Sequence, residues 1–185
     1  KDERADDDVA DDVHFHVDAS AHEGGAWVND PAGWKYCYTD STCAKGPLAI
    51  GADSYYFDEN GILGTGWVNY DGAWHWLGTS GRIATGWAKV ADAWYYMDNS
   101  GAMTTGWTQV RGSWFYLADS GKMATGWTKI GDSWYYFQES GAMATGWVND
   151  GGTWYYLNES GQMATGRVQI DGTWYTFDKS GALRR

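Results

Sequence analysis

Hydrophobic positions from residue 27 onward recur every 20 residues, a period that belongs to neither a single helix nor a single strand. One Trp series is joined by a second that is offset by seven residues, and six of the units end in a Thr-Gly pair after a Gly-x-Met, Gly-x-Leu or Gly-x-Ile step. The first series comprises Trp27, Trp67, Trp87, Trp107, Trp127 and Trp147. The second comprises Trp34, Trp74, Trp94, Trp114, Trp134, Trp154 and Trp174. Fixed-period self-similarity of this kind indicates a stacked repeat protein.

The repeat divides the chain into eight units that follow one another without an insertion. Pro47 and Ser54 replace both Trp residues of the second unit, and Arg167 replaces the first Trp of the last unit. Terminal units of stacked arrays are usually atypical because they cap the stack. The units are 27–46, 47–66, 67–86, 87–106, 107–126, 127–146, 147–166 and 167–185.

Each unit has the pattern of a β-hairpin. In residues 126–137, Trp127 to Ile130 forms one short strand, and Trp134 to Phe137 forms a second that is rich in β-forming residues. The Gly131-Asp132 pair between them, like Asp71-Gly72 elsewhere, is typical of tight hairpin turns. Because an isolated hairpin is marginally stable, the units must stack. The sequence therefore predicts an all-β solenoid of stacked two-stranded hairpins, with no helix in residues 27–185.

Composition and charge exclude some classes of function. The chain has 185 residues, 14 Trp, 13 Tyr and a net charge of −11. The acid excess argues against nucleic acid, and no apolar run is long enough to span a membrane. Residues 1–26 carry nine acidic and two basic residues, so we predict that they form an acidic lead-in or linker before the repeat module of residues 27–185.

More aromatic side chains are present than a stack of short hairpins needs for its core. Strand alternation places Trp134 and Tyr136 on one face and Tyr135 on the other. Several exposed aromatic rings per unit favour a binding surface. Ring faces suit either a quaternary ammonium ion or the apolar face of a sugar. A Met series, which can also serve as simple packing, favours a cage around methyl groups.

The unit Gly-Trp-x4-Gly-x-Trp-Tyr-Tyr-x4-Gly-x-Met-x-Thr, as in Gly126 to Thr145, resembles the choline-binding repeat of Gram-positive surface proteins, autolysins and phage lysins. The resemblance covers residues 27–185 and implies a left-handed hairpin solenoid. It also implies that choline of teichoic or lipoteichoic acid binds between consecutive hairpins. The implied protein is secreted, associated with the bacterial cell wall, and anchors or targets a surface protein.

Carried over to this sequence, the resemblance predicts cages built from two Trp residues, a Met and a Tyr of the next unit. Each Tyr was chosen by strand alternation, so its neighbour, such as Tyr135 or Tyr155, remains an alternative. The three complete predicted cages are Trp87, Trp94, Met103 and Tyr116; Trp107, Trp114, Met123 and Tyr136; and Trp127, Trp134, Met143 and Tyr156. Less complete ones are Trp67, Trp74 and Tyr96, which would face Ile83, and Trp147, Trp154 and Met163. No cage is expected at Pro47 and Ser54.

The alternative is a glucan-binding or polysaccharide-binding repeat module of a secreted enzyme or toxin-like protein. Such repeats share the aromatic-Gly hairpin but centre on Tyr or Phe and lack the regular Gly-Trp start. We expect no cofactor, no nucleic acid partner and no transmembrane segment. Exposed repeat ends allow a weak homodimer.

Few residues outside the repeat pattern suggest other chemistry. Cys37 and Cys43 are the only cysteines, and their spacing favours a disulfide over two free thiols or a metal site. His14, His16 and Asp18 alternate on one strand face, where a Zn²⁺ site is the less favoured interpretation. No catalytic motif is present. The chain is therefore predicted to be a wall-anchoring module, or the targeting part of a wall hydrolase whose catalytic domain lies elsewhere.

Overall fold

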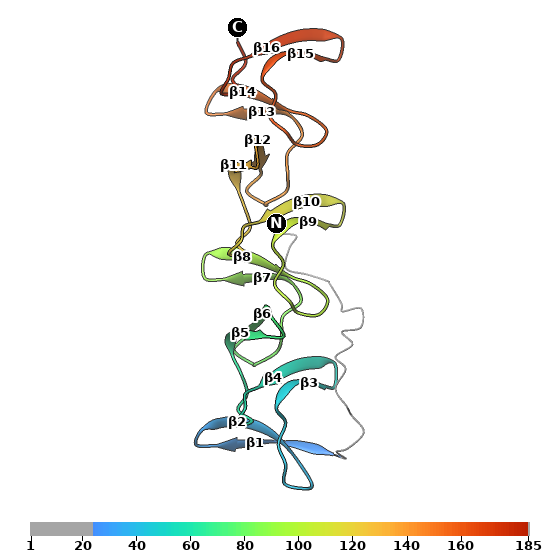
Figure 1. Cartoon of the computed structure of the whole chain (residues 1–185), viewed down its shortest axis with the longest axis vertical. Helices are drawn as coiled ribbons and strands as arrows, with labels where there is room; N and C mark the ends of the chain where they lie inside the picture. Colours follow the sequence, from blue (N-terminus) through green and yellow to red (C-terminus); the bar gives the residue numbers. More distant parts are fainter. Residues whose placement is uncertain (1–23, 185) are drawn as a thin grey trace. The chain divides into compact units, whose positions relative to one another are not determined.

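The computed structural model describes residues 24–184, and all regular elements in that range are β-strands. The sixteen strands form eight two-stranded antiparallel sheets, each made of two consecutive strands. Figure 1 shows these hairpins following one another in chain order. The strands of the first four hairpins are β1 (Gly25–Asp30), β2 (Gly33–Tyr38), β3 (Gly46–Ile50), β4 (Asp53–Phe57), β5 (Gly66–Tyr70), β6 (Ala73–Leu77), β7 (Gly86–Val90) and β8 (Ala93–Met97).

The same pattern continues in the second half of the chain. Its strands are β9 (Gly106–Val110), β10 (Ser113–Leu117), β11 (Gly126–Ile130), β12 (Ser133–Phe137), β13 (Gly146–Asp150), β14 (Thr153–Leu157), β15 (Gly166–Ile170) and β16 (Thr173–Phe177). The predicted fold class, an all-β solenoid of hairpins in 20-residue repeats, is confirmed. The chain forms two compact units of four hairpins each, which divide between Thr104 and Thr105 and are called the first and the second unit.

Tight turns join the two strands of each hairpin. At Asp71-Gly72 both residues have a positive φ, of 52° and 77°. Asp is one of the few residues with a side chain that tolerates this conformation, and Gly adopts it without steric cost. The turn residues identified in the sequence therefore sit where the hairpin needs them.

The most deeply buried part of the core is one apolar side chain from each hairpin after the first. These side chains end the second strand and pair across a loop with the Met, Leu or Ile six residues later, as Phe137 does with Met143. The fully buried members are Phe57, Leu77, Met97, Leu117, Phe137, Leu157 and Phe177. A continuous apolar column therefore replaces the core that a single hairpin lacks.

At the first hairpin a covalent bond occupies this core position. Cys37 and Cys43 are bridged in the same antiparallel way as Phe137 and Met143, and they form a disulfide. Neither Cys is fully buried. The predicted disulfide is confirmed, and it joins the ends of a loop that apolar burial closes in the later hairpins.

Some predictions concern residues outside the described range. The His14, His16 and Asp18 pattern falls there, as does most of the predicted lead-in of residues 1–26. Within residues 24–184, no helix is long and apolar enough to cross a membrane.

Candidate ligand-binding cages between successive hairpins

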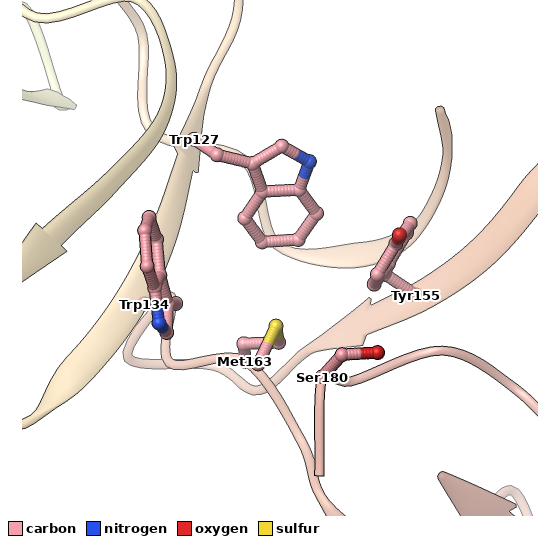
Figure 2. Close-up of a pocket in the computed structure, with 5 residues that line it drawn as sticks. All are labelled: Trp127, Trp134, Tyr155, Met163 and Ser180. Atoms are coloured by element: carbon pink, nitrogen blue, oxygen red, sulfur yellow. The ribbon is translucent and has the colours of Figure 1, made fainter. Parts of the chain in front are cut away.

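A cavity of about 270 Å³ opens between the β11–β12 hairpin and the β13–β14 hairpin. It is lined by Trp127, Trp134, Tyr155, Met163 and Ser180 (Figure 2). We call it the Trp127 cage. Its volume lies just below the usual range for small-molecule sites, about 300–1,000 Å³. Figure 2 shows the rings of Trp127, Trp134 and Tyr155 on three sides and the sulfur of Met163 below.

The two faces of a hairpin explain why these side chains meet. Cross-strand pairing places Trp127 beside Tyr136, and Lys129 beside Trp134, on one face of the β11–β12 hairpin. The next hairpin covers this face and turns its own opposite face toward it, which carries Tyr155. The ring centres of Trp127 and Tyr155 lie 4.7 Å apart at 62°, an edge-to-face contact.

Backbone hydrogen bonds fix the register between neighbouring hairpins. The amide of Met163 donates to the carbonyl oxygen of Trp134 at 2.8 Å, which brings the thioether beneath the Trp134 ring. Gly181 covers that thioether, and a Cβ at this position would collide with Sδ of Met163. Gly181 also has a φ of 82°, so the recurring Gly is required both by the backbone and by the Met beneath it.

Ser180 is a cage residue that the sequence analysis missed. It belongs to the loop after the β15–β16 hairpin, and its hydroxyl donates to Oδ1 of Asp178 at 2.6 Å. This hydrogen bond lowers the pKa of Asp178 below its ordinary value. The signal was present, because a Ser precedes the recurring Gly at 100, 120, 140, 160 and 180. We had interpreted that position only as a turn.

The same arrangement recurs at other hairpin junctions. In each, the first Trp contacts a Tyr of the next hairpin, and the carbonyl of the second Trp accepts a bond from the residue at the Met position. The sets in the second unit are Trp107, Trp114, Tyr135 and Met143, and Trp147, Trp154, Tyr175 and Leu183. In the first unit they are Trp67, Trp74, Tyr95 and Met103, and Trp27, Trp34, Tyr55 and Leu63.

The structure groups the predicted residues differently from the sequence analysis. The Tyr that faces each cage is the first of the pair, not Tyr96, Tyr136 or Tyr156, which lie beside the Trp of their own hairpin. The physical reason is that the covering hairpin presents the face opposite to its own Trp residues. Tyr95, Tyr135, Tyr155 and Tyr175 are the residues concerned.

The Met of each set comes from the next repeat along the chain, and not from the repeat that supplies the two Trp residues as the sequence analysis predicts. Met143, predicted with Trp127, bonds to the carbonyl of Trp114, and Met163 bonds to that of Trp134. Met103 likewise joins Trp74, where we had expected Ile83. Trp147 and Trp154 are completed by Tyr175 and Leu183, and Trp27 and Trp34 form a set that we had not predicted.

One predicted set extends across the division between the two compact units. Trp87, Trp94 and Met103 belong to the first unit and Tyr116 to the second. Within the first unit, the rings of Trp87 and Trp94 are 6.4 Å apart at 87°. Trp107 and Trp114 have nearly the same geometry, at 6.3 Å and 85°. The grouping of Trp87 with Tyr116 stays a prediction.

The junction between the β3–β4 hairpin and the β5–β6 hairpin lacks the two Trp residues of a cage. Ile83 donates its amide to the carbonyl of Ser54, so the backbone register is retained. Pro47 carries no aromatic ring, and the ring of Tyr70 stacks on Tyr56 at 4.7 Å and on His75 at 3.7 Å. These two partners occupy the positions of Tyr136 and Tyr155, the two rings that Trp127 contacts. Tyr70 therefore takes the place of the missing Trp, and we call this cluster the Pro47 joint.

Burial sets the protonation states within the Pro47 joint. It raises the pKa of the Tyr70 phenol far above its ordinary value. It also lowers the pKa of His75, despite the attraction of Asp98 and Asp71 for a proton there. The hydroxyl of Tyr70 is buried and has no hydrogen-bond partner. This junction therefore consists of closely packed neutral rings.

A cation of the chain itself occupies the Trp position of the last hairpin. The guanidinium carbon of Arg167 lies 4.5 Å from the ring centre of Trp174, which is the counterpart of Trp134. Lys89 lies 5.9 Å from the ring centre of Trp94 in the same way. These distances are within the range of cation–π contacts. The second Trp of a unit can therefore accept a positive charge over its face.

The fold and the site define a class, an array of β-hairpins with recurring aromatic clusters between successive members, one of which encloses a cavity. The choline-binding repeat family matches residues 84–125, 124–167 and 144–185, and a related cell wall binding repeat matches residues 65–83. These matches cover more than half of the chain, which therefore belongs to the choline-binding repeat family.

Solved structures agree with this assignment. CbpJ from Streptococcus pneumoniae TIGR4 is 41% identical over 82% of this chain, with a TM-score of 0.78. Choline-binding protein F from S. pneumoniae, solved in the presence of a peptidoglycan analogue, is 36% identical over 88% of the chain, with a TM-score of 0.81. The same protein in complex with ipratropium is 34% identical over 86%, with a TM-score of 0.78. The chain spans 56% to 58% of these relatives. No curated protein matches the chain.

Proposed function

We propose that this chain is a non-catalytic cell-wall-binding module that holds the choline of teichoic or lipoteichoic acid in its cages. In this proposal it anchors or targets a secreted surface protein at the bacterial cell wall. The observation that carries the proposal is the Trp127 cage, in which three aromatic rings, a thioether and a hydroxyl line a cavity of about 270 Å³. Such a cavity suits a trimethylammonium group, which is a cation with an apolar surface.

The cation contacts of the chain itself support a positively charged ligand. Arg167 lies over Trp174 at a distance suited to cation–π attraction. Choline binding by the relatives, which their names state, agrees with the same chemistry. A ligand ammonium over Trp134 would repeat the Arg167 contact two hairpins earlier.

Several weak sites suit a polymeric ligand. A few cation–π contacts give a dissociation constant on the order of millimolar for one cage. A polymer that carries many choline groups gains affinity when it fills several cages at once, because the later contacts form at a high effective concentration. We therefore assign avidity, and not single-site strength, as the basis of wall attachment.

The parts of the chain divide accordingly. We assign residues 27–185 to the binding module and residues 1–26 to an acidic lead-in or linker. The site residues that we assign are the Trp, Tyr and Met or Leu of each set described above. A catalytic partner domain would belong to another part of a longer protein.

The test is a titration of the full chain with choline chloride, followed by Trp fluorescence, with dextran in parallel. We expect a saturable millimolar response to choline and none to dextran. A response to dextran with silence toward choline would overturn the proposal and favour a glucan-binding module. Retention on a choline-bearing resin, with elution by free choline, provides a second readout.

A further inference from the structure

The carboxylate of Asp150 contacts the Trp127 side chain, which lines the cage. The indole nitrogen of Trp127 donates to Oδ2 of Asp150 at 3.0 Å. Asp150 ends β13, so it comes from the hairpin that covers the cage, as Tyr155 does. A hydrogen bond from an indole to a charged oxygen is stronger than one to a neutral acceptor.

No other covering hairpin carries a carboxylate at this repeat position. The Trp107 and Trp147 sets have Ile130 and Ile170 there, and Val110 stands at the same position of its unit. On the covering hairpins of the first unit the equivalent residues are Ile50, Tyr70 and Val90, and Asp30 of the first hairpin, at the same repeat position, forms an ion pair with Lys35 at 2.6 Å. The Trp127 cage is therefore distinguished by charge from sets that are otherwise built alike.

The hydrogen bond determines which part of the indole faces the ligand. Trp127 is held by Tyr136 at 5.1 Å, by Tyr155 at 4.7 Å and by Asp150. Figure 2 shows its six-membered ring turned toward Trp134 and Met163, with the nitrogen on the side away from Trp134. The benzene edge of the indole, and not its nitrogen, is thus directed at the cavity, and Trp134 turns its ring face toward the same space.

Asp150 also places a negative charge one hydrogen bond away from a ring that lines the cavity. The carboxylate is exposed, so its attraction for a cation is screened by water and salt. Exposed charge pairs contribute little, which corresponds to about a two- to five-fold change in affinity. A ligand of the same shape without a charge would gain nothing from it.

We propose that Asp150 is a specificity-determining residue that makes the Trp127 cage prefer a quaternary ammonium over a neutral group of the same shape. The inference rests on the proposed function, that the cages hold such a cation. It adds that the cages are unequal, and that this one binds the cation more tightly than the Trp107 cage.

The experiment uses the full chain labelled with isotope-enriched tryptophan, so that each indole N–H gives its own nuclear magnetic resonance signal. The ligands are choline and its uncharged analogue, in which carbon replaces the nitrogen. Asp150→Asn removes the charge and keeps an acceptor for the indole. Asp150→Ile copies Ile130 and removes both. Glu159→Gln, an exposed charge change on the loop of the same hairpin, is the matched control.

We expect Asp150→Asn to weaken choline at the Trp127 signal about two- to five-fold, with the analogue unchanged. In the same variant, choline binding at the Trp127 signal should depend less on salt concentration than in the wild-type protein. Choline binding at the Trp107 signal, and choline binding by the Glu159→Gln protein, should be the same as in the wild-type protein. In Asp150→Ile the indole N–H signal of Trp127 should also shift without ligand. Equal weakening of both ligands by Asp150→Asn, or none, would overturn the proposal. If no indole signal of the wild-type protein responds to choline, the proposed function itself fails.

Discussion

The Trp127 cage and the Pro47 joint lie at equivalent junctions between successive hairpins. The first junction contains a cavity, and in the second the rings pack against one another. Both have the backbone bond that fixes the register, from Met163 to Trp134 and from Ile83 to Ser54. In the cage, Trp127 and Trp134 leave a cavity between the hairpins. In the joint, Pro47 and Ser54 provide no rings, and Tyr70 stacks on the residues that a Trp would contact.

The difference shows that hairpins can stack with or without a cavity between their aromatic rings. The backbone bonds and the buried column are present at both junctions, so they hold the hairpins together. The two Trp residues are required only where a cavity is to remain. A ring supplied from the next hairpin restores packing without restoring the cage.

The largest effect is expected from Tyr70→Ala, which removes the ring that closes the joint. We expect the free energy of unfolding to fall by about 2–3 kcal/mol, because a large ring is lost between Tyr56 and His75. Choline binding in the second unit should not change. Thermal unfolding and a choline titration of the same sample test both points. Wild-type stability in this variant would show that Tyr70 does not support the junction.

Trp134→Ala is the converse change in the open cage. Trp134 is 41% exposed, so little stability should be lost. Removing one ring face should weaken choline in this cage about ten-fold, or about 1.4 kcal/mol. Trp174→Ala is the matched control, because Trp174 is the repeat counterpart of Trp134, is 54% exposed and already has the Arg167 guanidinium 4.5 Å from its ring centre. Equal losses in both variants, measured by titration, would contradict the assignment.

Tyr70→Phe sharpens the comparison without removing the ring. The phenol oxygen is buried and has no partner, so its desolvation is uncompensated. Replacing it with hydrogen should raise the free energy of unfolding by up to about 1 kcal/mol. Denaturant unfolding of the two proteins measures this. A loss of stability would indicate that the hydroxyl is hydrogen-bonded in solution.

The smallest effect concerns the pH dependence of the joint. Burial lowers the pKa of His75 below the ordinary imidazole value of 6.5. The unfolded chain then binds the proton more readily, so His75 should decrease stability as the pH falls below about 6.5. His75→Tyr, which restores the residue usual at this position, should flatten that part of the profile. Thermal unfolding from pH 8 to 5 tests it, and an unchanged slope would contradict the assignment.

The hairpins could be predicted from the sequence because their signals are local. The turn at Asp71-Gly72 and the strand pattern around Trp134 lie within one 20-residue unit. The Trp positions of the cages follow from the same repeat. Alternation also correctly separated Tyr135 from Trp134 and Tyr136.

The partners of each Trp could not be predicted in the same way, because they depend on contacts between units. Every unit contains two adjacent aromatic residues and a Met or Leu, so each candidate recurs at the same spacing. The choice of Tyr155 and Met163 for Trp127 follows from the face that the covering hairpin presents and from the bond between Met163 and Trp134. The role of Tyr70 was missed because its position carries an aliphatic residue in most other units.

Because the Trp127 cage combines the rings of one repeat with the Tyr and Met of the next, it has a consequence for how such a protein changes through gene rearrangement. Duplication or deletion of a complete 20-residue unit preserves the register of every remaining junction. Such a change alters the number of junctions by one, and the other junctions keep their Trp, Tyr and Met or Leu residues. Under the proposed function, the number of repeats sets how many cages a polymer can occupy at once, and a change such as Pro47 removes one cage without interrupting the array.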